Sequence, residues 1–185
     1  MEWIGYGALG ALILYLIGVY NGLVGLRARV GQAYADVDVQ LKQRHDLIPN
    51  LVETVKAYAA HERGTFDAVV KARNEAITAK GTGAQAGAEA TLSGSIGRLM
   101  ALAEAYPDLK ADENFRQLQT DLAETEDNLA AARRFFNNAV QEYNASLQSF
   151  PAVLFSSALG FTQREFFDLG ESERQRLDVA PQVKF

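Results

Sequence analysis

Residues 3–26 contain no charged side chain, and the chain then continues directly into charged sequence with helical periodicity. As an α-helix, this segment spans roughly 36 Å, which is enough to cross a hydrocarbon core of about 30 Å with some tilt. No proline or loop signal separates it from Arg27 and Arg29. The sequence therefore predicts a membrane-spanning helix that leaves the bilayer as a rigid stalk.

A cleaved signal peptide is the alternative interpretation of this segment. Signal peptides have a basic amino end, a shorter apolar core and a small-residue cleavage site, whereas here Glu2 is acidic and the apolar stretch is long. Trp3 and Tyr20 suit aromatic anchors at the two interfaces, so we favour a retained anchor. Because lysines and arginines follow the span, the positive-inside rule predicts an outward amino terminus and a cytoplasmic domain.

The span is rich in glycine. Gly18 and Gly22 form a small-xxx-small pattern, and Gly25 continues it. Such patterns let two helices approach closely in lipid, although they also arise by chance in glycine-rich spans. Self-association of the anchor into a homo-oligomer is one expectation from this face.

The rest of the chain is long enough for one domain, which we place at residues 27–160 and follow with an extended tail at residues 161–185. There is no cysteine, which excludes a disulfide framework and a cysteine-based zinc site. The net charge of −5 argues against nucleic acid as a partner, because nucleic-acid binding needs a concentrated basic face.

The most regular pattern is a seven-residue repeat near the carboxyl end. It predicts a helix over residues 112–149 that packs in an antiparallel, coiled-coil-like bundle and stops at Pro151. Large residues on one stripe alternate with small ones on the neighbouring stripe, which suits interdigitation. The large residues of this bundle seam are Phe115, Leu122, Leu129, Phe136, Tyr143 and, at the end, Phe150.

The stalk carries a comparable apolar stripe through Val37 and Ile48. Pro49 removes a helical hydrogen bond to residue 45, so we expect a kink near residues 45–49, or a short break with Asp46 as cap. The helix is then expected to continue to Ala79, and a shorter helix to cover residues 88–105 after a flexible connection. The predicted fold class is all-α: an amino-terminal transmembrane helix continuous with an antiparallel bundle of three to four long helices.

Polar residues cluster at the expected kink. Two interpretations remain open: a network that satisfies the kink and fixes bundle register, or a site that binds a partner helix. Helical spacing puts the acidic members and the asparagine on one face. The cluster consists of Arg44, His45, Asp46, Pro49, Asn50 and Glu53.

No catalytic, cofactor-binding or metal site is expected. His61 and Glu62 begin like a zinc-protease motif, but Thr65 stands where the second histidine would be. Two histidines make a poor metal site, and there is no phosphate-binding loop after a strand. We expect a non-enzymatic protein.

Residues 150–161 carry no charge and are too short to span a bilayer. They either lie in the membrane interface or cap the bundle core. Capping is preferred, because serines and a glycine dilute the apolar surface and no basic residue flanks the run closely.

Several segments resemble the signature of the LemA family. They are Tyr20 to Val24, Asp38 to Lys56, Glu142 to Asn144, Phe150-Pro151, Gly160-Phe161 and Phe166-Phe167. The resemblance implies an amino-terminal membrane helix and a helical bundle, and it implies no established reaction. A relative in magnetosome-forming bacteria is associated with building membrane compartments. His45 stands where relatives often carry tyrosine, which weakens any claim for special imidazole chemistry there.

Two hypotheses for function follow. The first is a bundle that self-assembles through its anchor and stalk to scaffold or organise the inner membrane, with the lipid bilayer and further copies of itself as partners. The second is a membrane-tethered adaptor or regulator of another envelope protein, such as a membrane protease.

Overall fold

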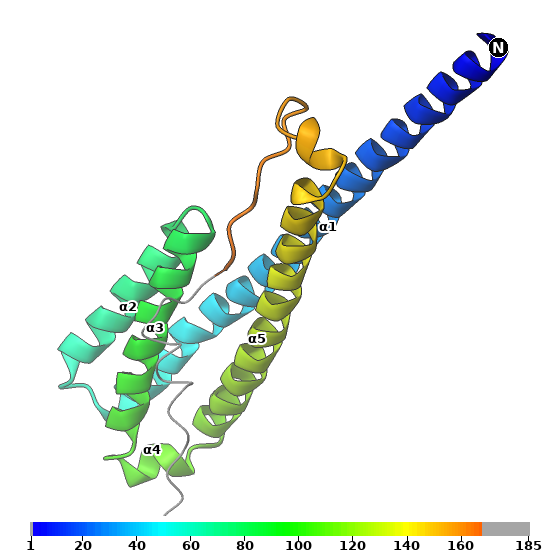
Figure 1. The fold of residues 1–185 in the computed structure, drawn as a ribbon. Coiled ribbons are helices and arrows are strands. Elements are labelled where there is room, and N and C mark those ends of the chain that lie inside the picture. The colour runs from blue at the N-terminus through cyan, green and yellow to red at the C-terminus, as the bar shows by residue number, and fades with distance from the viewer. Residues whose placement is uncertain (1, 168–185) are drawn as a thin grey trace, which may run out of the picture. The chain divides into compact units, whose positions relative to one another are not determined.

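The computed structural model describes residues 2–167, and within this range all regular structure is helical (Figure 1). The prediction of an all-α fold is therefore confirmed. The elements are α1 (Glu2–Tyr58), α2 (Arg63–Thr78), α3 (Thr82–Ala103), α4 (Pro107–Ala111), α5 (Glu113–Gln148) and a short 3-10 helix, η1 (Ala152–Leu154). The predicted tail lies outside the described residues from position 168 onward.

The chain divides into two compact units, to which α1 and α5 both contribute. Among the described residues, we call residues 2–37 together with residues 132–165 the anchor unit, and residues 38–131 with residues 166–167 the bundle unit.

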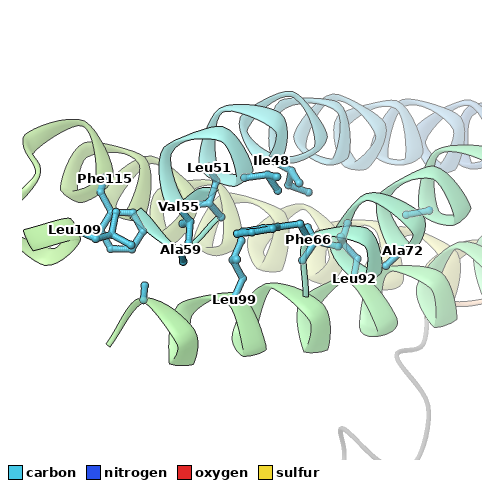
Figure 2. Close-up of a cluster of buried hydrophobic side chains, with 14 residues drawn as sticks. Ile48, Leu51, Val55, Ala59, Phe66, Ala72, Leu92, Leu99, Leu109 and Phe115 are labelled. Carbon is cyan, nitrogen blue, oxygen red and sulfur yellow. The ribbon is translucent and has the colours of Figure 1, made fainter. Parts of the chain in front are cut away.

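The core of the bundle unit is a cluster of buried apolar side chains from all five helices (Figure 2). Leu51 and Val55 of α1 belong to this cluster together with Leu92 and Leu99 of α3, and all four are inaccessible to solvent. Full burial of such a side chain contributes about 1.5–3 kcal/mol relative to exposure. The other members are Ile48, Val52, Ala59, Phe66, Val69, Ala72, Ala76, Ala103, Leu109 and Phe115.

In the anchor unit, the carboxyl-terminal part of α5 packs beside α1. The rings of Tyr34 and Phe136 lie 5.6 Å apart between centroids. The buried residues of α1 follow helical spacing, so one stripe of the stalk faces α5. These residues are Leu23, Val30, Ala33 and Val37, and α5 contributes Phe136, Ala139, Val140, Tyr143 and Leu147.

The seam residues of α5 are divided between the units. Phe115 and Leu129 are buried in the bundle unit, where Leu122 is partly buried, and Phe136 and Tyr143 are buried in the anchor unit. The predicted bounds of this helix agree with α5 to within a residue at each end. Phe150, one further step along the stripe, lies beyond the helix and is exposed.

The predicted end of the stalk helix is wrong. The stalk helix ends at Tyr58 instead of continuing to Ala79, and α2 turns back so that Phe66 and Val69 reach the same core. The apolar spacing is helical on both sides of the turn, so periodicity alone does not reveal the reversal.

The connection between α2 and α3 is also shorter than predicted. Residues 82–87, which we expected to be flexible, form the first turns of α3. The chain reverses at Gly81, whose φ of 85° lies in the left-handed region that glycine adopts without a steric penalty.

Candidate functional site

A buried ionic cluster in the bundle unit is centred on Glu89 of α3. The Glu89 side chain is 1% exposed. Its Oε2 accepts a hydrogen bond from Arg44 Nη1 at 3.0 Å, and its Oε1 lies 2.6 Å from His45 Nε2. An ionised carboxylate only accepts hydrogen bonds, so His45 donates from Nε2 in this pair. Two consecutive residues of α1 therefore bind one carboxylate.

Arg44 also contacts α5. Its Nη2 donates to Ser93 Oγ at 2.7 Å and lies 3.2 Å from Glu126 Oε2. The Arg44 side chain is 6% exposed, whereas that of Glu126 is 45% exposed. The guanidinium therefore joins α1, α3 and α5 and has one carboxylate in the core and one at the edge. Such an arrangement gives the buried guanidinium the charged and hydrogen-bonding partners that it needs.

Pro49 lies inside α1 and does not interrupt it. The proline ring removes the N–H that would bind the carbonyl of His45. Arg73 of α2 takes that place, because its Nε donates to the His45 carbonyl oxygen at 2.7 Å. The predicted break with Asp46 as cap is wrong, since residues 45–49 are helical throughout.

The other predicted members of the polar cluster do not join this network. Asp46, Asn50 and Glu53 are exposed. Asp46 binds Lys42 at 2.6 Å, and this hydrogen bond holds the pKa of the Asp46 carboxyl below its usual value. Glu53 pairs with Lys56 at 3.4 Å. The six residues thus separate into three groups. Two are buried in the network, one is a proline within the helix, and Asp46, Asn50 and Glu53 form an exposed polar face.

Sequence reasoning missed four residues of the site: Arg73, Glu89, Ser93 and Glu126. One signal was available, because Glu89 is the only charged residue between Lys80 and Arg98. A lone carboxylate on a helix of small and apolar residues is expected to need a partner. Which partner it binds depends on contacts between distant segments, and the local pattern does not contain them.

Among the described residues, no group of three or more histidine, cysteine or acidic side chains is arranged to hold a metal ion. Arg44 and His45 bind Glu89, and Arg73 binds the backbone carbonyl of His45. The geometry is therefore suited to holding helices in place.

The glycine face of the anchor is open. A methyl group added at Gly18, Gly22 or Gly25 would meet no neighbouring heavy atom within 4 Å. The apolar part of α1 is long enough to cross a membrane and is almost entirely exposed. Gly22 also lines a shallow groove whose other wall includes Phe150 and Pro151.

The segment after α5 does not act simply as a cap. Pro151, Ala152 and Phe161 are buried, and the ring of Phe161 meets that of Tyr20 edge to face at a centroid distance of 5.5 Å. Phe150, however, points away from the core and is 80% exposed. Capping therefore accounts for Pro151, Ala152 and Phe161, and it does not account for Phe150.

Comparison with known proteins gives a consistent result. The model of the LemA family matches residues 33–185. The magnetosome protein MamQ of Magnetospirillum gryphiswaldense is 25% identical over 186 residues, which cover 86% of this chain and 68% of MamQ. The magnetosome protein MamQ 2 of Paramagnetospirillum magneticum is 26% identical over 183 residues, which cover 85% of this chain and 67% of the relative. The resemblance inferred from the sequence is confirmed: this chain belongs to the LemA family.

Proposed function

We propose that this membrane-associated helical protein is not an enzyme and that it self-assembles through its anchor to scaffold the bacterial inner membrane. The observation that carries the proposal is the open glycine face on the exposed apolar part of α1. No other part of the described chain covers Gly18 or Gly25. Close approach of a second copy of α1 would bury this face, as small-residue patterns do in lipid.

The relatives support a role in membrane organisation. Two of them are named as magnetosome proteins. A scaffold needs a defined shape more than a reactive centre. The buried cluster of Arg44, His45 and Glu89 supports this reading, because it ties three helices together and leaves none of these groups free.

The proposed orientation places the bundle unit in the cytoplasm. Arg27 and Arg29 directly follow the apolar segment, whereas Glu2 before it is acidic. Basic residues beside a span are retained on the cytoplasmic side.

The test is the mass of the full-length protein in mild detergent, measured by multi-angle light scattering and imaged by negative stain. The wild type is expected to form a discrete oligomer. The double variant Gly18→Leu, Gly25→Leu is expected to fall to a smaller species, because leucines block close helix approach. Gly5→Leu is the matched control, since residue 5 lies about 140° around the helix from residue 18.

A monomeric wild type would refute self-assembly. It would favour the second hypothesis, a membrane-tethered adaptor of another envelope protein. An oligomer that withstands the double variant would place the interface elsewhere and refute the role of the glycine face.

A further inference from the structure

Two uncharged segments lie side by side in the anchor unit. The first is residues 3–26 of α1, and the second is residues 143–163, which include the end of α5 and the turn that follows. Tyr20 contacts Phe161, and a groove between the segments is lined by Tyr15 and Val19 on one side and Phe150 on the other. The second segment therefore packs against the part of α1 expected to lie in the membrane.

The charges that end both segments lie at one level. Arg29 Nη1 binds Glu142 Oε2 at 2.8 Å. Arg164 is tied to the same turn of α5, because its N–H donates to Asn144 Oδ1 at 2.9 Å and its carbonyl accepts from Asn144 Nδ2 at 2.8 Å. A bilayer surface at Arg27, about 3 Å along α1 from Arg29, leaves Arg27, Arg29, Glu142 and Arg164 in water and the two uncharged segments largely on the apolar side.

The turn presents four of its apolar side chains outward. Leu154 is 72% exposed and Phe150 is 80% exposed, and Val153 and Leu159 are also exposed. Pro151, Ala152 and Ser156 of the same turn are buried, and Ser157 is exposed. The exposed apolar side chains form a contiguous surface, which in a protein usually marks contact with another apolar surface.

The backbone of the turn is also suited to lipid. An unbonded backbone N–H is costly in hydrocarbon, so irregular segments there must satisfy their own polar groups. Pro151 has no N–H, and Gly160 supports the reversal with a φ of 76°. Internal hydrogen bonds bind the N–H groups of Val153, Leu154, Phe155, Ser156, Leu159, Gly160 and Phe161.

We propose that residues 150–161 form a second membrane element, an apolar turn embedded beside the spanning helix in the leaflet on the Arg29 side. The occupant of its exposed face is lipid, because this face is continuous with the apolar surface of α1 and begins at the same charge boundary. Residues 15–26 of α1, against which the turn packs, cover roughly 16 Å of helix, about half of a hydrocarbon core. The inference rests on the anchor crossing the membrane and not on self-assembly.

The chain has no cysteine, so single-cysteine variants of the full-length protein can carry one fluorescent label each. Leu154→Cys tests the turn, and Leu159→Cys repeats the test at a second exposed site. Arg134→Cys, on an exposed position of α5 about 12 Å before Glu142, is the aqueous control. Leu14→Cys labels the spanning helix itself. The labelled proteins are placed in phosphatidylcholine–phosphatidylglycerol vesicles, and quenching by doxyl-labelled lipid is compared with quenching by iodide.

Labels at positions 154 and 159 are expected to be quenched by doxyl lipid as strongly as the label at position 14, and to be protected from iodide. The label at position 134 is expected to show the opposite. Iodide quenching at positions 154 and 159, or protection from both quenchers as a protein partner would produce, overturns the membrane turn. If position 14 also escapes doxyl lipid, the anchor itself fails, which separates that failure from failure of the turn alone.

Discussion

Replacement of Arg44 by methionine is expected to destabilise the bundle strongly. The substitution keeps an unbranched side chain of similar length and removes the charge. Glu89 then keeps a carboxylate that is 1% exposed and has the His45 ring as its remaining side-chain hydrogen-bond partner among the contacts described above. The separation of 3.0 Å between Arg44 Nη1 and Glu89 Oε2 corresponds to about 5 kcal/mol of attraction at an effective dielectric constant of about 20.

The expected loss is about 3–5 kcal/mol in the free energy of unfolding, the usual effect of breaking a buried pair from one side. The double variant Arg44→Met, Glu89→Met removes both charges and is expected to recover most of that loss, because apolar replacement of a whole buried pair is often neutral. Glu126 remains, but its half-exposed carboxylate can be solvated by water.

The measurement is urea unfolding of the full-length protein in dodecyl maltoside, followed by circular dichroism at 222 nm. Lys42→Met is the matched control, because Lys42 lies on the same helix in an exposed pair with Asp46 and should change stability little. A loss below about 1 kcal/mol for Arg44→Met, or a double variant whose loss is the sum of the single losses, would refute a coupled buried pair.

Three further outcomes are expected, each from thermal or urea unfolding of the same protein. Arg73→Ala leaves the carbonyl of His45 unbonded and should lower stability by about 1–3 kcal/mol, and equal stability would mean that Pro49 needs no such compensation. Gly81→Ala forces alanine into a left-handed conformation and should lower stability by about 1–2 kcal/mol, whereas a more stable variant would contradict the turn geometry. Asp112 caps α5, and its bond to the N–H of residue 115 lowers the pKa of its carboxyl below 3.8. The stability that the Asp112 carboxylate contributes is therefore present above pH 3.8 and is lost as the pH falls through the folded-state pKa. The difference in unfolding free energy between wild type and Asp112→Asn should therefore shrink in acid. A difference that does not depend on pH would contradict this account.

The sequence predicts the long helices well because their core contacts repeat along the chain. The seven-residue repeat from Phe115 to Tyr143 indicates α5, and the absence of charge in residues 3–26 indicates the anchor. The reversal after Tyr58 is not predictable in the same way, since the apolar period continues through the turn and only packing against the core determines the fold there.

The candidate site was only half predictable. A proline inside a helical pattern indicates that the carbonyl of His45 needs a donor, but Arg73, which supplies it, lies in another helix. Helical spacing placed Asp46 and Glu53 together correctly, yet burial decides which side of α1 carries the network. That side holds Arg44 and His45. Glu89, which binds both, lies 44 residues after His45 in the chain.

The central claim, self-assembly through the glycine face, is tested most directly by disulfide cross-linking in intact membranes. Gly18→Cys places a thiol on that face, and Leu16→Cys places one about 160° around the same helix. With mild oxidation, our account predicts a covalent dimer from Gly18→Cys and almost none from Leu16→Cys. Equal yields at the two positions, or no dimer at either, would contradict it.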